Sequence, residues 1–277
     1  MEYRNSIIVR RIFISFICFG LLLGLLWGYL HFWNIQPNAP QNAQPTIPGK
    51  WKLTFDDEFN GPVLDESKWN TEDYKVGEYR NCCLNYGVQY FTPQALSLAN
   101  GSLQIKTAQQ EMGTRNYTSG AITTENKFSL LYGRVDVRAK LPKTQGLWPA
   151  IWLLPYDTNA NLGGVFEIDM MELNGSHPNV IHMTNHWGKQ QAYRDYTGGP
   201  DYSQNYHIFS IVWTRQTITW YIDGIARFQV SQHVSNKSLY LIINASLGGR
   251  YVGKPDSSTV LPQYMNIDYV RVYKPAS

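Results

Sequence analysis

The 277-residue chain contains few cysteines and few charged residues, and each shortage excludes a class of protein. Three cysteines cannot form a dense disulfide framework or a closed four-cysteine zinc site. Charged residues make up 16% of the chain and aromatic residues 14%, whereas disordered chains are rich in charge and poor in aromatics. The chain also shows no internal repeat of fixed period.

The charge of the chain is distributed unevenly. Residues 1–50 hold four basic groups and one acidic group, out of 24 basic and 21 acidic groups in the whole chain. Subtracting the first set from the second leaves 20 of each sign in residues 51–277. A nucleic-acid-binding domain normally carries a basic excess, so the sequence predicts no nucleic-acid partner.

A long apolar segment lies near the N-terminus. Residues 12–33 are 22 residues without Asp, Glu, Lys or Arg, and about 20 such residues span the roughly 30 Å hydrocarbon layer of a membrane. Three arginines precede the segment and no basic residue follows until Lys50. This asymmetry predicts a cytoplasmic N-terminus over residues 1–11, a single transmembrane anchor over residues 12–33, and export of the rest to the periplasm or the exterior. The alternative is secretion after signal-peptide cleavage, but such a peptide has a shorter apolar region and a small-x-small cleavage site.

The anchor is followed by a linker and then by the exported domain. Residues 34–50 contain four prolines and six Asn or Gln, a composition typical of an extended linker. The exported domain therefore begins near Trp51 and runs to residue 277. Cys82 and Cys83 are adjacent in it, and the sequence leaves open whether they form a disulfide or remain two thiols.

From Trp51 onward the sequence alternates short β-type runs with turn signals. Asn100-Gly101 separates residues 96–98 from 103–105, and Asp223-Gly224 separates residues 218–222 from 225–230. Both pairs suit type I′ hairpin turns. Many short antiparallel strands predict an all-β domain: a two-sheet antiparallel β-sandwich or jelly roll of the concanavalin-like kind.

Residues 165–173 (VFEIDMMEL) place three carboxylates in an apolar strand. Side chains alternate along a strand, so Glu167 and Asp169 share a face and Glu172 would point the opposite way. One extra residue in a β-bulge at Met170-Met171 would return Glu172 to the same face.

Two carboxyl groups on one face suit glycoside hydrolysis with retention, in which one acts as nucleophile and the other as acid/base. In such a pair the two carboxyl groups lie about 5–5.5 Å apart. Two carboxylates at this distance cannot both ionise easily, so one holds a proton near neutral pH. Alternative interpretations of the three acids are the charged outer face of an edge strand and an oxygen-ligand cation site.

This strand resembles the catalytic strand of family 16 glycoside hydrolases in its bulged E-x-D-x-x-E form. Further stretches match the family in order, from about Trp51 to Tyr273. They are residues 51–61 (WKLTFDDEFNG), 64–65 (LD), 68–69 (KW), 132–135 (YGRV), 141–142 (LP), 146–155 (GLWPAIWLLP), 206–209 (YHIF), 213–214 (WT), 220–224 (WYIDG) and 265–273 (MNIDYVRVY).

The resemblance implies a jelly roll with an open cleft that cleaves β-linked polysaccharides internally, with retention and without a cofactor for catalysis. Glu167 resembles the nucleophile, Glu172 the acid/base and Asp169 their assisting partner. Substrate-binding residues implied in the same way are Trp152, His186, Asn85, Trp148 and Gln89. Many members also hold a structural calcium. The residues that resemble its ligands are Glu58, Asp268 and, through its carbonyl, Gly101.

Three departures from the family pattern concern substrate binding. Residues 85–87 (NYG) stand where laminarin-cleaving members often have Asn-Asn-Glu, residues 119–121 (SGA) replace Ser-Gly-Arg, and residues 162–165 (LGGV) lack the usual tryptophan. The leading hypothesis is a monomeric, membrane-anchored endo-β-glucanase acting on β-1,3- or mixed-linkage β-1,3-1,4-glucan. Agarose, carrageenan and xyloglucan stay open as substrates. A transglycosylase, a non-catalytic β-glucan-binding protein and a purely structural exported domain are the alternatives.

Overall fold

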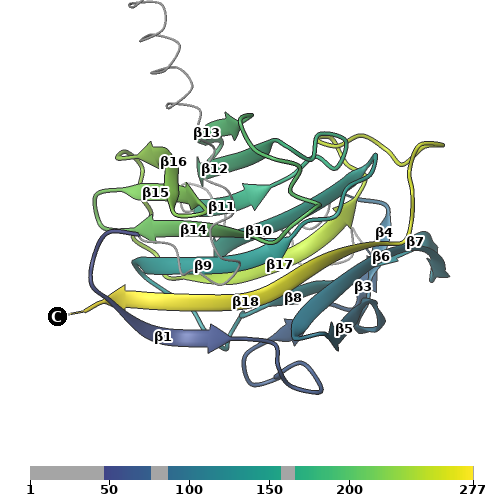
Figure 1. The fold of residues 1–277 in the computed structure, drawn as a ribbon, viewed down its shortest axis with the longest axis horizontal. Helices are drawn as coiled ribbons and strands as arrows, with labels where there is room; N and C mark the ends of the chain where they lie inside the picture. Colours follow the sequence, from purple (N-terminus) through teal and green to yellow (C-terminus); the bar gives the residue numbers. More distant parts are fainter. Residues whose placement is uncertain (1–46, 76–86, 157–165, 277) are drawn as a thin grey trace, which may run out of the picture. The chain divides into compact units, whose positions relative to one another are not determined.

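The computed structural model describes residues 47–75, 87–156 and 166–276. Their regular structure is almost entirely β, with one short 3₁₀ turn, η1 (Pro93–Ala95) (Figure 1). Among the described residues, none lies in a helix long and apolar enough to cross a membrane. The expected N-terminus 1–11, the anchor 12–33 and most of the linker 34–50 lie outside the described residues, as do Cys82, Cys83 and Asn85.

The larger of the two sheets has eleven strands. Along its main path they are β16 (Ile225–Val230), β15 (Ile218–Ile222), β14 (His207–Trp213), β9 (Gly133–Lys140), β18 (Gln263–Pro275), β6 (Ser102–Met112), β7 (Arg115–Ser119), β4 (Gln89–Phe91) and β3 (Tyr74–Lys75). Two further strands, β1 (Trp51–Asp57) and β5 (Leu96–Ala99), pair with β18 and β6. All pairs are antiparallel except β4 with β7.

The second sheet has seven strands, all in antiparallel pairs. In spatial order they are β13 (Gln190–Tyr196), β12 (Ile181–Trp187), β11 (Phe166–Glu172), β10 (Leu147–Pro155), β17 (Leu239–Leu247), β8 (Ala121–Thr123) and β2 (Asn70–Thr71). The strand with the three carboxylates, β11, is therefore an inner strand, flanked by β10 and β12. This position excludes the edge-strand interpretation of its acids.

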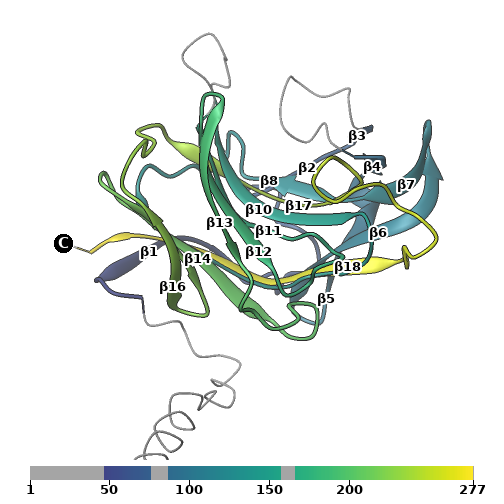
Figure 2. The same cartoon turned by 90° about the horizontal axis from the view of Figure 1, so that it is seen from above.

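The two sheets pack face to face around one hydrophobic core (Figure 2). Ile151 and Ile168 of the smaller sheet belong to the same buried cluster as Val137 and Ile211 of the larger one. Because side chains alternate along a strand, the residues between these positions point to the outer faces. The expected all-β two-sheet sandwich is confirmed.

Both predicted hairpins are present. Ala99 pairs with Ser102 across Asn100-Gly101, and Ile222 pairs with Ile225 across Asp223-Gly224. All four turn residues have positive φ, between 52° and 78°. A type I′ turn requires positive φ at both central residues, and Asn, Asp and Gly tolerate this conformation best.

Candidate active site

Strand β11 contains a bulge at the predicted place. On the β12 side, Asp169 pairs with Thr184 and Glu172 pairs with His182, so Met170 and Met171 together face one residue. On the β10 side, Trp152 pairs with Asp169 and Ile151 with Met171. Met170 is therefore the extra residue, and the strand shifts by one position between the second and third acids.

The pairing register shows which way the three acids point. Their partners on β12 are His186 for Glu167, Thr184 for Asp169 and His182 for Glu172. These partners are spaced by two residues, so they lie on one face, and directly opposed residues share a face. All three carboxylates therefore lie on the outer face of the seven-stranded sheet, which we call the acidic face.

A tryptophan from the opposite sheet holds the bulge. Trp220 of β15 is fully buried, and its Nε1 donates a hydrogen bond of 2.8 Å to the backbone oxygen of Asp169. A bulge interrupts the ladder of backbone hydrogen bonds, and a buried carbonyl without a partner is costly. Trp220 supplies this partner from within the core. Sequence reasoning did not identify this role, because no local pattern links residues 169 and 220.

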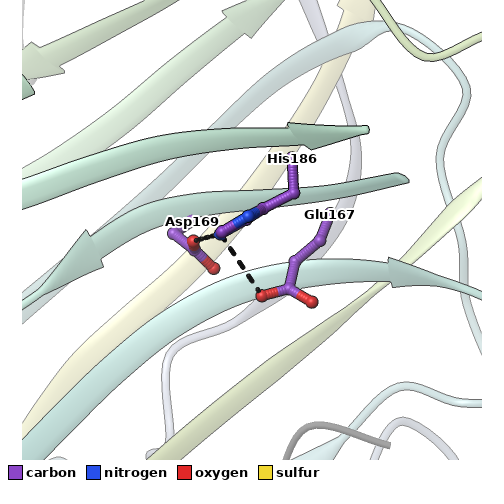
Figure 3. A group of neighbouring side chains, drawn as sticks. All are labelled: Glu167, Asp169 and His186. Atoms are coloured by element: carbon purple, nitrogen blue, oxygen red, sulfur yellow. Dashed lines mark hydrogen bonds and ion pairs between the residues drawn. The ribbon is translucent and has the colours of Figure 1, made fainter. Parts of the chain in front are cut away.

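His186 joins the first two acids, as Figure 3 shows. Its Nε2 lies 2.9 Å from Asp169 Oδ2 and 3.9 Å from Glu167 Oε1. The side chain of Asp169 is 5% exposed, that of Glu167 19% and that of His186 31%. The ligand atoms of Glu167, Asp169 and His186 lie within 4.8 Å of one another, so the two carboxyls interact directly.

Burial and mutual repulsion disfavour ionisation of the acids. Burial, followed by the charge of Asp169, raises the pKa of Glu167 well above its usual value. Burial, followed by the charge of Glu172, does the same to the pKa of Asp169. Burial also raises the pKa of Glu172, opposed by His182, by a hydrogen bond from Trp148 and by His186. The three acids can therefore hold a proton at a pH where isolated carboxyls are ionised.

Two tryptophans of β10 belong to the site. Trp148 Nε1 donates a 2.8 Å hydrogen bond to Glu172 Oε1. Trp152 is the cross-strand neighbour of Asp169 on the acidic face, and its Nε1 donates a hydrogen bond of 2.8 Å to Asn244 Oδ1. Trp152 is only 5% exposed. The structure thus places both next to the acids, with Trp148 in direct contact.

Gln89 and Asn85 differ from the other expected binding residues. Gln89 is fully buried, and its Oε1 accepts a hydrogen bond from the Leu247 backbone N–H at 2.9 Å. It is thus placed in the interior and not on the surface that a polysaccharide contacts. Asn85 lies outside the described residues, so its binding role stays a prediction.

Two of the three expected calcium ligands, Glu58 and Asp268, bind arginines. Glu58 accepts hydrogen bonds of 2.6 and 2.8 Å from Arg271, and Asp268 accepts one of 2.6 Å from Arg138. Calcium prefers several free oxygen ligands around it. Because guanidinium groups already bind both carboxylates, Glu58, Asp268 and the Gly101 carbonyl together do not fit a calcium ion as they are placed here.

The remaining alternative for the acids is a cation site. Glu167, Asp169 and His186 each offer one ligand atom, and these atoms lie within 4.8 Å of one another. The same short spacing suits proton sharing. A cation site at these three residues would leave out Glu172, which has a separate environment made by Trp148 and His182. A displacement reaction that uses two carboxyls gives Glu172 a role as well.

Comparison with known proteins adds independent information. Residues 89–251 match the family model described as glycosyl hydrolases family 16. The chain is 36% identical to glucan endo-1,3-beta-glucosidase A1 of Niallia circulans, covering 84% of this chain and 39% of that protein. It is 31% identical to a beta-glucanase of Rhodothermus marinus, covering 81% and 85%. The crystal structure of an endo-beta-1,3-glucanase from Pyrococcus furiosus superposes with a TM-score of 0.77 at 34% identity, covering 86% of this chain and 100% of that one.

Proposed function

The chain belongs to family 16 of the glycosyl hydrolases, and from this we propose that it is a retaining endo-β-glucanase acting on β-1,3- or mixed-linkage β-1,3-1,4-glucan. The observation that carries the proposal is the bulge, which brings Glu167, Asp169 and Glu172 to one face of β11. Relatives named for endo-1,3-β-glucan and β-glucan cleavage support the substrate class.

In the first step, Glu167 attacks the anomeric carbon and forms a glycosyl–enzyme ester. The bond from that carbon to the linking oxygen breaks, and Glu172 gives its proton to this oxygen. In the second step, Glu172 removes a proton from water, the water oxygen attacks the anomeric carbon, and Glu167 leaves as a carboxylate. The two displacements together retain the configuration of the anomeric carbon.

The environments of the two glutamates suit these roles. Glu172 needs a proton at the start, and burial raises its pKa. Glu167 must attack as an anion, so a proton held by these two neighbouring acids has to reside on Asp169 at that moment. His186, at 2.9 Å from Asp169, fixes the orientation of this carboxyl. Asp169 and His186 are therefore positioning residues for the nucleophile.

The location of the enzyme also belongs to the proposal. The apolar run at residues 12–33 and the arginines before it support a single membrane anchor with the domain 51–277 on the outside. An open cleft over the acidic face, wide enough for an internal segment of a polysaccharide, and a monomeric state complete the prediction. Protease protection of residues 1–11 in intact cells would test the orientation.

The deciding experiment incubates the full-length protein with laminarin, lichenan, agarose, carrageenan and xyloglucan. We expect oligosaccharides of several lengths from the first two, with the β anomer formed first in NMR spectra. Glu167→Gln and Glu172→Gln should abolish release of reducing ends while circular dichroism stays unchanged. A Glu167→Gln protein that works at the wild-type rate would refute the nucleophile assignment. Products longer than the substrate would identify a transglycosylase, and binding without cleavage a glucan-binding protein.

A further inference from the structure

Four aromatic rings form a continuous series at the Glu172 end of the acidic face. Tyr193 of β13 contacts His182 of β12 with ring centroids 5.2 Å apart, and His182 contacts Tyr251 at 5.6 Å. Tyr251, in the segment after β17, contacts Trp148 of β10 at 5.4 Å. We call these four residues the aromatic belt.

Three rings of the belt, Trp148, His182 and Tyr251, lie next to one of the two glutamates, and Tyr193 extends the series outward from His182. Trp148 donates a hydrogen bond to Glu172, and His182 is its cross-strand partner. The pKa of Tyr251 is raised by burial and then by the charge of Glu172, so this ring also lies close to the carboxylate. Glu167 has different neighbours, His186 and Asp169.

Polar contacts fix the His182 ring and the backbone that carries Tyr251. His182 Nδ1 lies 2.5 Å from Asp195 Oδ1 on the neighbouring strand. The Tyr251 backbone oxygen accepts a hydrogen bond of 3.3 Å from Asn174, and the next carbonyl, of Val252, accepts one of 3.2 Å from Gln145. A rigid aromatic surface binds a ligand with little loss of conformational entropy.

The outer end of the belt is open to solvent. Tyr193 is 56% exposed, and a large ring exposed on an outer strand of the sheet gains little from packing in the free protein. An aromatic ring that is apolar on its face and polar at its edge fits the apolar C–H face and the hydroxyl rim of a sugar. A neutral oligosaccharide is therefore the ligand class that this surface matches.

We propose that the aromatic belt binds the leaving-group portion of the glucan, over more than one sugar ring. The assignment rests on the proposed function: Glu172 protonates the oxygen of the departing sugar, so rings gathered around Glu172 flank that sugar. Tyr193 stands two strands away from β11 and contacts a sugar beyond the first one. The same surface holds a sugar acceptor if the enzyme transfers glycosyl groups.

The test compares two substrates on the full-length protein. One is an end-labelled β-1,3-linked glucose hexamer, and the other is a 4-nitrophenyl β-1,3-diglucoside, whose leaving group has one ring and reaches only the inner part of the belt. For Tyr193→Ala we expect kcat/KM on the hexamer to fall about fivefold to tenfold, with cleavage moved towards the reducing end. Cleavage of the nitrophenyl substrate should stay within about twofold of wild type.

Matched variants separate the ring from the fold. Tyr193→Phe keeps the ring and should retain hexamer cleavage. Tyr264→Ala removes a 40%-exposed tyrosine from β18, in the other sheet, and should leave both substrates unaffected. An unchanged hexamer rate and cleavage pattern in Tyr193→Ala would overturn the assignment, as would an equal loss on both substrates.

Binding separates failure of this inference from failure of the proposed function. Calorimetry of the hexamer on Glu167→Gln, with and without Tyr193→Ala, needs no turnover. Weaker binding of the double variant supports the belt even if the wild-type protein cleaves no glucan. Equal binding of the two proteins refutes it.

Discussion

The hydrogen bond from Trp220 to the catalytic bulge gives the sharpest test of how the fold builds the site. Trp220→Phe keeps a buried ring but removes the Nε1–H donor, so the Asp169 carbonyl stays buried without its partner. Such a group costs about 1–3 kcal/mol. The substitution also replaces a larger ring by a smaller one, and the cavity left in the core lowers stability independently of the hydrogen bond.

The chain offers a matched control for the lost volume. Trp213 is also fully buried in the core, and its Nε1 has no hydrogen-bond partner among the described residues. Among the described residues, Trp213 contacts the ring of Tyr132 at 5.3 Å and Trp220 contacts the ring of Phe228 at 4.9 Å. Trp213→Phe therefore removes the same atoms without breaking a hydrogen bond. We expect Trp220→Phe to lose about 1–3 kcal/mol more in free energy of unfolding than Trp213→Phe.

Urea unfolding and hydrolysis rates on the same preparations would measure both effects. For a domain of this size, a difference of about 1 kcal/mol corresponds to roughly 2–4 °C in Tm. Because the bulge aims Glu172, Trp220→Phe should also lower kcat by up to about 100-fold, whereas Trp213→Phe leaves kcat close to wild type. Equal stabilities and equal kcat values for the two variants would refute the idea that this hydrogen bond holds the bulge.

Two further predictions concern ionisation and metal. Burial raises the pKa of Glu167 in the folded protein above 4.5, so the folded state binds more protons than the unfolded state and wild-type stability falls as pH rises through this window. Glu167→Gln removes this loss, so in urea unfolding its stability advantage over the wild type should grow from pH 4 to pH 7, and an advantage that stays constant would contradict the raised pKa of Glu167. Because arginines occupy Glu58 and Asp268, neither EDTA nor millimolar calcium should change Tm, and a rise of several degrees with calcium would show that the ion displaces them.

Local patterns in the sequence were sufficient to predict the all-β fold, the two hairpins and the common face of the three acids. Asn100-Gly101 and Asp223-Gly224 specify their turns through the φ values that these residues tolerate. The alternation in β11 and the doubled methionine marked the bulge, because side-chain direction along a strand depends only on neighbouring residues. Motif order from Trp51 to Tyr273 indicated the family before any contact was known.

Contacts between distant segments were decided only by the tertiary structure. It placed Gln89 in the interior, paired Glu58 and Asp268 with arginines, and brought Trp148 to Glu172. Trp220 reaches Asp169 across 51 positions, and the rings of the belt come from three strands and a loop. A sequence specifies which way each side chain leaves its strand, but strand order and register determine what that side chain meets, and both depend on how the whole chain packs.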